Sequence, residues 1–233
     1  MERPILFSGP MVRQILSGNK TQTRRIIKNV PPDCDRVLKA CDNSGEYKFF
    51  SRMSYGSMLA KTKWFKCPYG LPSDRLWVRE TWQYYDWTED GEPWIKYGAD
   101  EGVSLTKNMP EEWWDKVWDV WSDLSVSENY KIDGRAADRK WRPSIYMPRW
   151  ASRITLEITD IRVERVQEIS RADAKAEGFL PGMNGLEKWA GRTYGNAQLA
   201  FEACWKDING KKPGRAWEDN PWVWVIEFRR IKP

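Results

Sequence analysis

The segment 222–228 restricts the fold more than any other part of this sequence. Its residues, WVWVIEF, are apolar at every position except one. A strand that is apolar on both faces must be covered on both faces, so we expect it inside the protein. Alternating apolar residues predict further strands at 21–27, 75–82 and 154–163, with short helices between them. Strands separated by helices without a βαβ repeat favour a small mixed barrel over a parallel sheet, so the predicted class is α+β.

Capping signals define the predicted helices. One begins near Ser8 and stops at Gly18, one begins at Ser170 and stops at Gly178, and a third covers residues 196–208. Pro110 opens a fourth, whose apolar stripe is more typical of a packed face than of a ligand site: Trp114, Val117, Trp118, Trp121 and Leu124.

Two segments carry more local expectations. Residues 28–74 contain Pro31-Pro32 and a CPYGLP turn at 67–72, which predict a loop-rich region. Within 154–163 the apolar positions change parity at Thr159-Asp160, which predicts a bulge or bend.

Charge varies along the chain. Lys plus Arg is 38 and Asp plus Glu is 33, a formal net charge of +5. Residues 1–30 and 129–165 are basic, whereas 86–128 hold twelve acids and three lysines. We therefore expect a single domain over 1–233 with an acidic, Trp-rich insertion lobe at 86–140, and two basic segments that meet on one face or are simply solvated surface.

The composition excludes several classes of enzyme. There is no histidine, so Ser-His-Asp triads, Cys-His dyads and HExxH zinc sites are impossible. The cysteines at 34, 41, 67 and 204 form no CxxC pair, and neither a metal nor an organic cofactor is implied. The chain shows no signal core and no long apolar stretch, so a cytoplasmic protein with no membrane partner is expected.

The segment 18–25, GNKTQTRR, has the densest set of reactive groups. On a strand, Thr21, Thr23 and Arg25 share one face, and Arg24 lies on the other. Lys20 sits in the preceding turn, and burial beside arginines would lower its pKa enough for it to take a proton from a hydroxyl. The alternative is an exposed basic turn that begins an edge strand.

Four segments in this order resemble the ASCH family: 18–25 (GNKTQTRR), 74–80 (DRLWVRE), 174–179 (AKAEGF) and 222–228 (WVWVIEF). With 8–11 and 143–152, the whole chain apart from 86–140 looks like the larger phage and prophage branch of that family. The resemblance implies a PUA-like mixed β-barrel with flanking helices.

The family includes amidohydrolases that act on N4-acetylcytidine, and the resemblance places their catalytic Lys, Thr and Glu at Lys20, Thr23 and Glu177. It implies hydrolysis of an N4-acylated or otherwise modified cytidine, free or in nucleic acid. Thr23 would be the nucleophile with Lys20 as its base, or Lys20 or Glu177 would activate water directly; both routes stay open. Arg24, Arg25 or backbone N–H groups would stabilise the oxyanion.

Further residues are candidates for binding the substrate or nucleic acid, with RNA the expected polymer: Thr21, Arg24, Arg25, Arg79, Glu80, Arg149 and Trp150. Aromatic residues interleaved with arginines suit base stacking and phosphate contact, although core packing is preferred for Trp77 and Trp82. Glu80 competes with Glu177 and needs a partner, for which Lys20 or Arg25 is the candidate.

Two other functions are kept. The first is a non-catalytic module that binds RNA or modified DNA. The second is a phage-encoded protein that acts on a host factor through the acidic lobe.

Overall fold

The computed structural model describes residues 1–231 except 32, 42–43, 54–56, 89, 91, 107–108, 118–139, 181–186 and 190. Strands dominate and helices are few, which confirms the α+β class. None of the helices in this described part combines the length and apolar character needed to cross a membrane.

The chain separates into two compact units. The first contains Met1, Ser17–Arg75 and Glu157–Arg230, and the second contains Glu2–Leu16, Leu76–Leu156 and Ile231–Pro233. The lobe expected at 86–140 falls within the second unit, and residues 118–139 of it lie outside the described residues. The single-domain interpretation stays a prediction.

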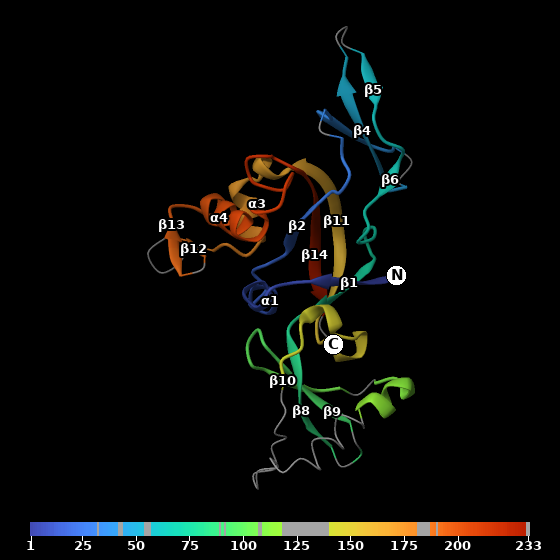
Figure 1. The fold of residues 1–233 in the computed structure, drawn as a ribbon, viewed down its shortest axis with the longest axis vertical. Helices are drawn as coiled ribbons and strands as arrows, with labels where there is room; N and C mark the ends of the chain where they lie inside the picture. Colours follow the sequence, from blue (N-terminus) through green and yellow to red (C-terminus); the bar gives the residue numbers. More distant parts are fainter. Residues whose placement is uncertain are drawn as a thin grey trace. The chain divides into compact units, whose positions relative to one another are not determined.

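Five strands follow one another in the order β1-β7-β11-β14-β2 (Figure 1). Their bounds are Glu2–Leu6 for β1, Arg75–Arg79 for β7, Thr155–Arg165 for β11, Trp222–Ile231 for β14 and Gln22–Ile26 for β2. As expected, β14 is an interior strand, and its first five residues are buried. The strand order has two ends, β1 and β2, so the described strands form no closed barrel.

Within the first unit, the predicted loop region proves wrong. It contains a second antiparallel sheet, with strands β3 (Arg36–Lys39), β4 (Glu46–Arg52), β5 (Met58–Ala60) and β6 (Phe65–Lys66). In β4, alternate residues are buried: Tyr47, Phe49 and Ser51. The prolines and the 67–72 turn flank these strands and do not interrupt them, which is why the turn signals misled the prediction.

Two helices of the first unit confirm their capping signals. At the start of α3 (Arg171–Ala176), the Ser170 hydroxyl accepts a hydrogen bond from the Asp173 N–H, and the Asp173 carboxylate accepts one from the Ser170 N–H. The Asn196 side chain caps α4 (Ala197–Asn209). Both helices lie beside β2 in Figure 1, and α3 contacts both α4 and β2. A small hairpin, β12 (Glu187–Trp189) with β13 (Arg192–Tyr194), precedes α4.

The second unit contains helix α1 (Gly9–Leu16) and an antiparallel sheet of β8 (Trp82–Trp87), β9 (Pro93–Tyr97) and β10 (Val103–Leu105). The strand predicted at 75–82 is therefore two strands, since β7 ends at Arg79 and β8 begins at Trp82. Short 3-10 turns cover Glu111–Trp113, Ser144–Tyr146 and Arg149–Ala151. One apolar cluster forms the core of this sheet: Trp82, Tyr84, Ile95, Tyr97, Val117, Met147 and Ala151.

The structure also bears on the parity change predicted at Thr159-Asp160 and on the helix predicted after Pro110. In β11, burial moves from Leu156 and Ile158 to Ile161, which confirms the change of parity. The helix expected after Pro110 begins as the Glu111–Trp113 turn and is helical at 114–117, but the rest of its stripe lies outside the described residues.

Aromatic rings fill the contact between the β3–β6 sheet and β14 in the first unit. Phe49 stacks on Phe65 with ring centroids 5.2 Å apart and lies 5.3 Å from Trp222. Tyr47 meets Trp224 edge to face at 5.1 Å. Because these rings touch both sheets, they couple the second sheet to the buried strand.

We expect Phe49→Ala to reduce the free energy of unfolding by about 3–5 kcal/mol, because it leaves a cavity among packed rings. Phe50→Ala is the matched control, since the neighbouring ring is only partly buried on the opposite face of β4. Urea denaturation measures both. Equal losses in the two variants would contradict this assignment of the core.

Candidate functional site

The start of β2 and the end of α3 bring Lys20 and Glu177 together. Gly18, at φ +79°, turns the chain after α1, and Glu177 is the C-cap of α3. The Thr21 N–H donates to the Ala176 carbonyl at 2.8 Å, and the Thr21 carbonyl accepts the Phe228 N–H at 2.8 Å. These backbone bonds fix the residue after Lys20 between α3 and β14.

The Lys20 ammonium and the Glu177 carboxylate form a buried, hydrogen-bonded pair. Lys20 Nζ donates to Glu177 Oε2 at 2.6 Å and to the Glu177 carbonyl at 2.9 Å. Each residue is only 3% exposed. Glu177 Oε1 has no hydrogen-bond partner in the described part of the chain and lies 3.6 Å from Arg24 Nη1.

Burial lowers the pKa of Lys20, and the positive charge of Arg25 lowers it further. The Glu177 carboxylate opposes both effects. A lysine with a lowered pKa is neutral, and so able to accept a proton, at a pH where an ordinary lysine is charged. The nearby thiol of Cys204 behaves differently, because burial raises its pKa to about 12 and keeps it protonated.

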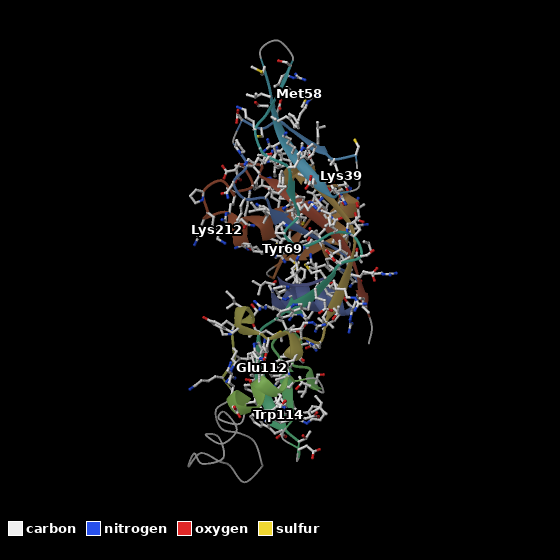
Figure 2. All side chains as sticks on the ribbon, turned by 90° about the vertical axis from the view of Figure 1, so that its right-hand side faces the viewer. Lys39, Met58, Tyr69, Glu112, Trp114 and Lys212 are labelled. Carbon is white, nitrogen blue, oxygen red and sulfur yellow. The ribbon has the colours of Figure 1, made fainter. Side chains whose placement is uncertain are left out.

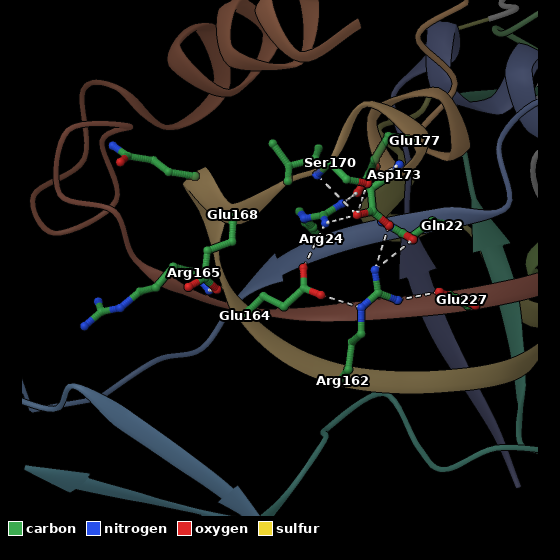
Figure 3. Close-up of polar contacts among 12 residues, drawn as sticks. Gln22, Arg24, Arg162, Glu164, Arg165, Glu168, Ser170, Asp173, Glu177 and Glu227 are labelled. Carbon is green, nitrogen blue, oxygen red and sulfur yellow. Dashed lines mark hydrogen bonds and ion pairs between the residues drawn. The ribbon is translucent and has the colours of Figure 1, made fainter.

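Arg24 is the centre of a set of carboxylates on the same side of β2 (Figure 3). Its side chain is fully buried, with Nη2 3.0 Å from Glu164 Oε2 and 3.5 Å from Asp173 Oδ2. Arg162 on β11 bonds to Glu164 at 2.5 Å, to Asp173 at 2.7 Å, and to Glu227. No sequence pattern indicated this network beyond the capping box at Asp173.

This network bears on the expectation that the two basic segments meet on one face. Arg24 comes from the first basic segment and Arg162 from the second, and they do meet, but around shared carboxylates. Their charges are neutralised within the protein, so this region offers no basic surface to a partner.

Thr23 and Arg25 lie on the other face of β2. In the register with β14, Thr23 is opposite Ile226 and Arg25 is opposite Trp224. Thr23 is 4% exposed, and among the described contacts its hydroxyl bonds to neither Lys20 nor Glu177. The structure thus joins two of the three residues expected to be catalytic. The charge of Arg25 acts on Lys20 and interacts with Glu177.

Glu80 pairs with Arg153, so the prediction that Lys20 or Arg25 would be its partner is wrong. Both Glu80 oxygens accept from Arg153, each at 3.0 Å, within the second unit. Arg153 also bonds to Asp100 at 2.7 Å and stacks over Tyr97 at 4.0 Å. Burial raises the pKa of Glu80 despite these bonds. This arrangement matches an ion pair that holds the unit together.

The other candidate binding residues of the second unit are also engaged in its packing. The Arg79 guanidinium lies 4.7 Å over the buried Trp77 ring. Arg149 donates to Glu2 at 2.8 Å. Trp150 is half-buried and meets Trp82 edge to face at 6.3 Å.

These contacts confirm core packing for Trp77 and Trp82. In the first unit, Thr21 is exposed and contributes the backbone bonds described above. Among the described residues, no cluster of three or more cysteine, aspartate or glutamate side chains is arranged to hold a metal ion.

Comparisons of the chain with protein families, with curated proteins and with solved structures found no match. The functional argument therefore depends on the residues of this site and their geometry.

The Asp173 contacts predict a loss of stability in acid. Burial raises the pKa of Asp173, but hydrogen bonds from Ser170 and the charges of Arg24 and Arg162 lower it by more. A lowered pKa means that the folded state binds this proton more weakly than the unfolded chain does. The stabilisation is therefore present above the ordinary aspartate value and is lost as pH falls through the lowered pKa.

We expect Asp173→Asn to cost about 1–2 kcal/mol at pH 7 and to flatten the decline of stability below pH 4. Denaturation midpoints measured from about pH 2 to 7 test this. Glu112→Gln, at an exposed acid, is the control. If the two variants had the same pH profile, Asp173 would not stabilise the network.

Proposed function

We propose that this protein is an amidohydrolase that removes the acyl group from an N4-acylated cytidine, free or in nucleic acid, on a PUA-like ASCH fold. The Lys20–Glu177 pair carries the proposal. The motif resemblance designates these two residues, which are 157 positions apart, and they form a hydrogen bond of 2.6 Å. Pairing of a lysine of lowered pKa with a carboxylate is one way to build an acid–base site without histidine.

The reaction needs a base, a nucleophile and a proton for the leaving nitrogen. Neutral Lys20 takes a proton from water as the water oxygen attacks the acyl carbonyl. The tetrahedral intermediate then breaks its C–N bond, and the proton passes to the cytosine N4. The products are the free carboxylic acid and cytidine, so every atom of water and substrate is accounted for.

The geometry favours activated water over a Thr23 nucleophile. Lys20 donates to Glu177, and among the described contacts the Thr23 hydroxyl bonds to neither residue. Glu177 then has the role of a positioning residue. It holds the Lys20 amine by a hydrogen bond and compensates the positive charge that forms on the amine when it takes the proton. Under this route, Thr23→Val retains turnover and no acyl-enzyme forms.

Arg25 is better suited than Arg24 to stabilise the oxyanion. The charge of Arg24 is shared among three carboxylates. Burial lowers the pKa of Arg25, although Tyr69 and Glu177 oppose this effect. The charge of Arg24 is therefore already committed, and Arg25, whose charge acts on Lys20 and interacts with Glu177, is the candidate to stabilise a developing negative charge.

Access to the pair is part of the mechanism. Lys20 and Glu177 are each only 3% exposed, so they are covered by other side chains. The nucleobase therefore reaches the amine by displacing the side chains that cover it.

Incubation with N4-acetylcytidine should release cytidine and acetate, and Lys20→Ala should reduce the rate by at least ~10²-fold because the base is lost. The rate should rise with pH as Lys20 loses its proton, with the midpoint below the ordinary lysine value of 10.5. Chromatography of the nucleosides measures both effects.

Lys175→Ala is the matched control, since it removes an exposed lysine from α3 and leaves the pair intact. Mass spectrometry of the quenched enzyme distinguishes the two routes, because a Thr23 nucleophile would carry the acyl group. No turnover by the wild-type protein, or equal turnover by the Lys20 and Lys175 variants, would rule out the assignment.

A second candidate function, binding of single-stranded RNA, is favoured by the β3–β6 sheet. Between residues 36 and 66 the chain has seven Lys or Arg and two acids, a balance of 7 − 2 = +5. Several large apolar side chains of this sheet and its turns are exposed: Leu38, Met53, Met58, Leu59 and Trp64. Lys39 and Met58 are labelled on it in Figure 2.

Trp64 gives this surface its most specific feature. The residue is 44% exposed, and Lys48 Nζ lies 5.5 Å from the centroid of its ring. An exposed aromatic ring beside an ammonium group suits stacking of a base next to its phosphate. This surface consists of residues other than those expected from the sequence to bind nucleic acid.

We expect Trp64→Ala to weaken binding of a single-stranded RNA oligonucleotide by roughly 1–3 kcal/mol, because one stacking contact is lost. The logarithm of the binding constant should also fall linearly with the logarithm of the salt concentration. Fluorescence anisotropy measures both effects. Trp141→Ala, at another exposed tryptophan, is the control; equal weakening, or binding that salt does not affect, would contradict this surface.

A further inference from the structure

A cavity of about 490 Å³ opens at the opposite end of β2 from Lys20, within the first unit. The end of β2, the start of β14 and the last residue of β11 form its walls together with the 213–221 segment. Small-molecule sites commonly enclose ~300–1,000 Å³, so this cavity is large enough for a ligand the size of a nucleotide.

Cations dominate the polar lining. Lys28, Arg165 and Arg215 face a single carboxylate, that of Asp219. Asp219 Oδ2 already accepts the Ala216 N–H at 3.0 Å. Among the described residues, none of the three cations forms an ion pair with a carboxylate. The cavity therefore has an excess of positive charge, in contrast to the neutralised network around Arg24.

Arg165 is held rigidly in this wall. Its guanidinium lies 4.2 Å over the Trp222 ring. Its Nη1 donates to the Asn220 carbonyl at 3.0 Å and its Nη2 to the Cys34 carbonyl at 2.7 Å. Burial lowers the pKa of Arg165, which nearby acids only partly oppose. A fixed guanidinium that forms no direct ion pair among the described residues is well prepared for an anion, because little side-chain freedom is lost on binding.

Apart from Asn29 and Gly214, the rest of the lining is apolar, and its three prolines make it stiff. Ile26, Val30, Pro31, Pro213 and Pro221 contribute hydrocarbon surface to it. Such walls suit the flat ring and sugar of a nucleoside and give a bare inorganic anion nothing further to contact.

We propose that this cavity binds a nucleoside monophosphate, with the phosphate at Lys28, Arg165 and Arg215 and the nucleoside against the apolar wall. The site is separate from the Lys20–Glu177 pair and does not depend on either function proposed above.

Isothermal titration of the full chain with adenosine 5′-monophosphate tests the proposal. A purine is chosen because it differs from the acylated cytidine assigned to the Lys20 site. The monophosphate should bind at least tenfold more tightly than adenosine and more tightly than inorganic phosphate. If the monophosphate binds more tightly than adenosine, the difference measures the contacts between the cations and the phosphate. If it binds more tightly than inorganic phosphate, the difference measures the contacts of the nucleoside with the apolar wall.

Arg215→Ala should weaken binding of the monophosphate about tenfold, and Lys28→Glu should weaken it further, since it places a negative charge at the mouth of the cavity. Lys211→Ala is the control, because that exposed lysine does not line the cavity. Lys28 is exposed, so its substitution is compatible with folding; the melting temperature confirms this for each variant.

Three results would overturn the proposal. Equal affinity for adenosine and its monophosphate would exclude the phosphate contacts. Equal affinity for inorganic phosphate would exclude the nucleoside. Unchanged binding in both the Lys28 and Arg215 variants would place the ligand elsewhere. Deacylation of N4-acetylcytidine by the same variants is measured separately, and a failure there leaves this test intact.

Discussion

Buried charge at β2 is the constraint on which the first unit depends. Lys20 and Arg24 are both removed from water, and an unpaired ammonium or guanidinium there would be very costly. Glu177, Asp173 and Glu164 compensate them. Because Asp173 and Glu177 belong to or cap α3, the position of that helix against β2 follows from charge pairing as well as from apolar packing.

The same constraint separates residues that hold the protein together from residues that remain available for function. Arg24 and Arg162 share their carboxylates, and Arg153 is matched by Glu80 and Asp100. By contrast, within the described part of the chain, Glu177 retains an oxygen without a hydrogen bond, and the three cations that line the cavity at the end of β2 form no ion pair with an acid. Incomplete compensation of charge, more than its mere presence, is what points to chemistry or binding here.

Local signals anticipated several elements well. The capping residues Ser170 and Asn196 predicted where α3 and α4 begin, and the apolar run of β14 predicted an interior strand. These succeed because a cap and a burial pattern are properties of a few neighbouring residues. The β3–β6 sheet was missed, since its strands are short and their pairing joins residues that no local pattern relates, such as Phe50 with Ala60.

The sequence by itself determined the α+β class, the helix starts, the absence of histidine chemistry and the identity of Lys20 and Glu177 as candidates. Only the tertiary structure decided which charges meet. It paired Lys20 with Glu177 and Glu80 with Arg153, and among the described contacts the Thr23 hydroxyl bonds to neither member of the first pair. The physical reason is that an ion pair depends on distance and burial in space, and spacing along the chain fixes neither when the partners are 157 residues apart.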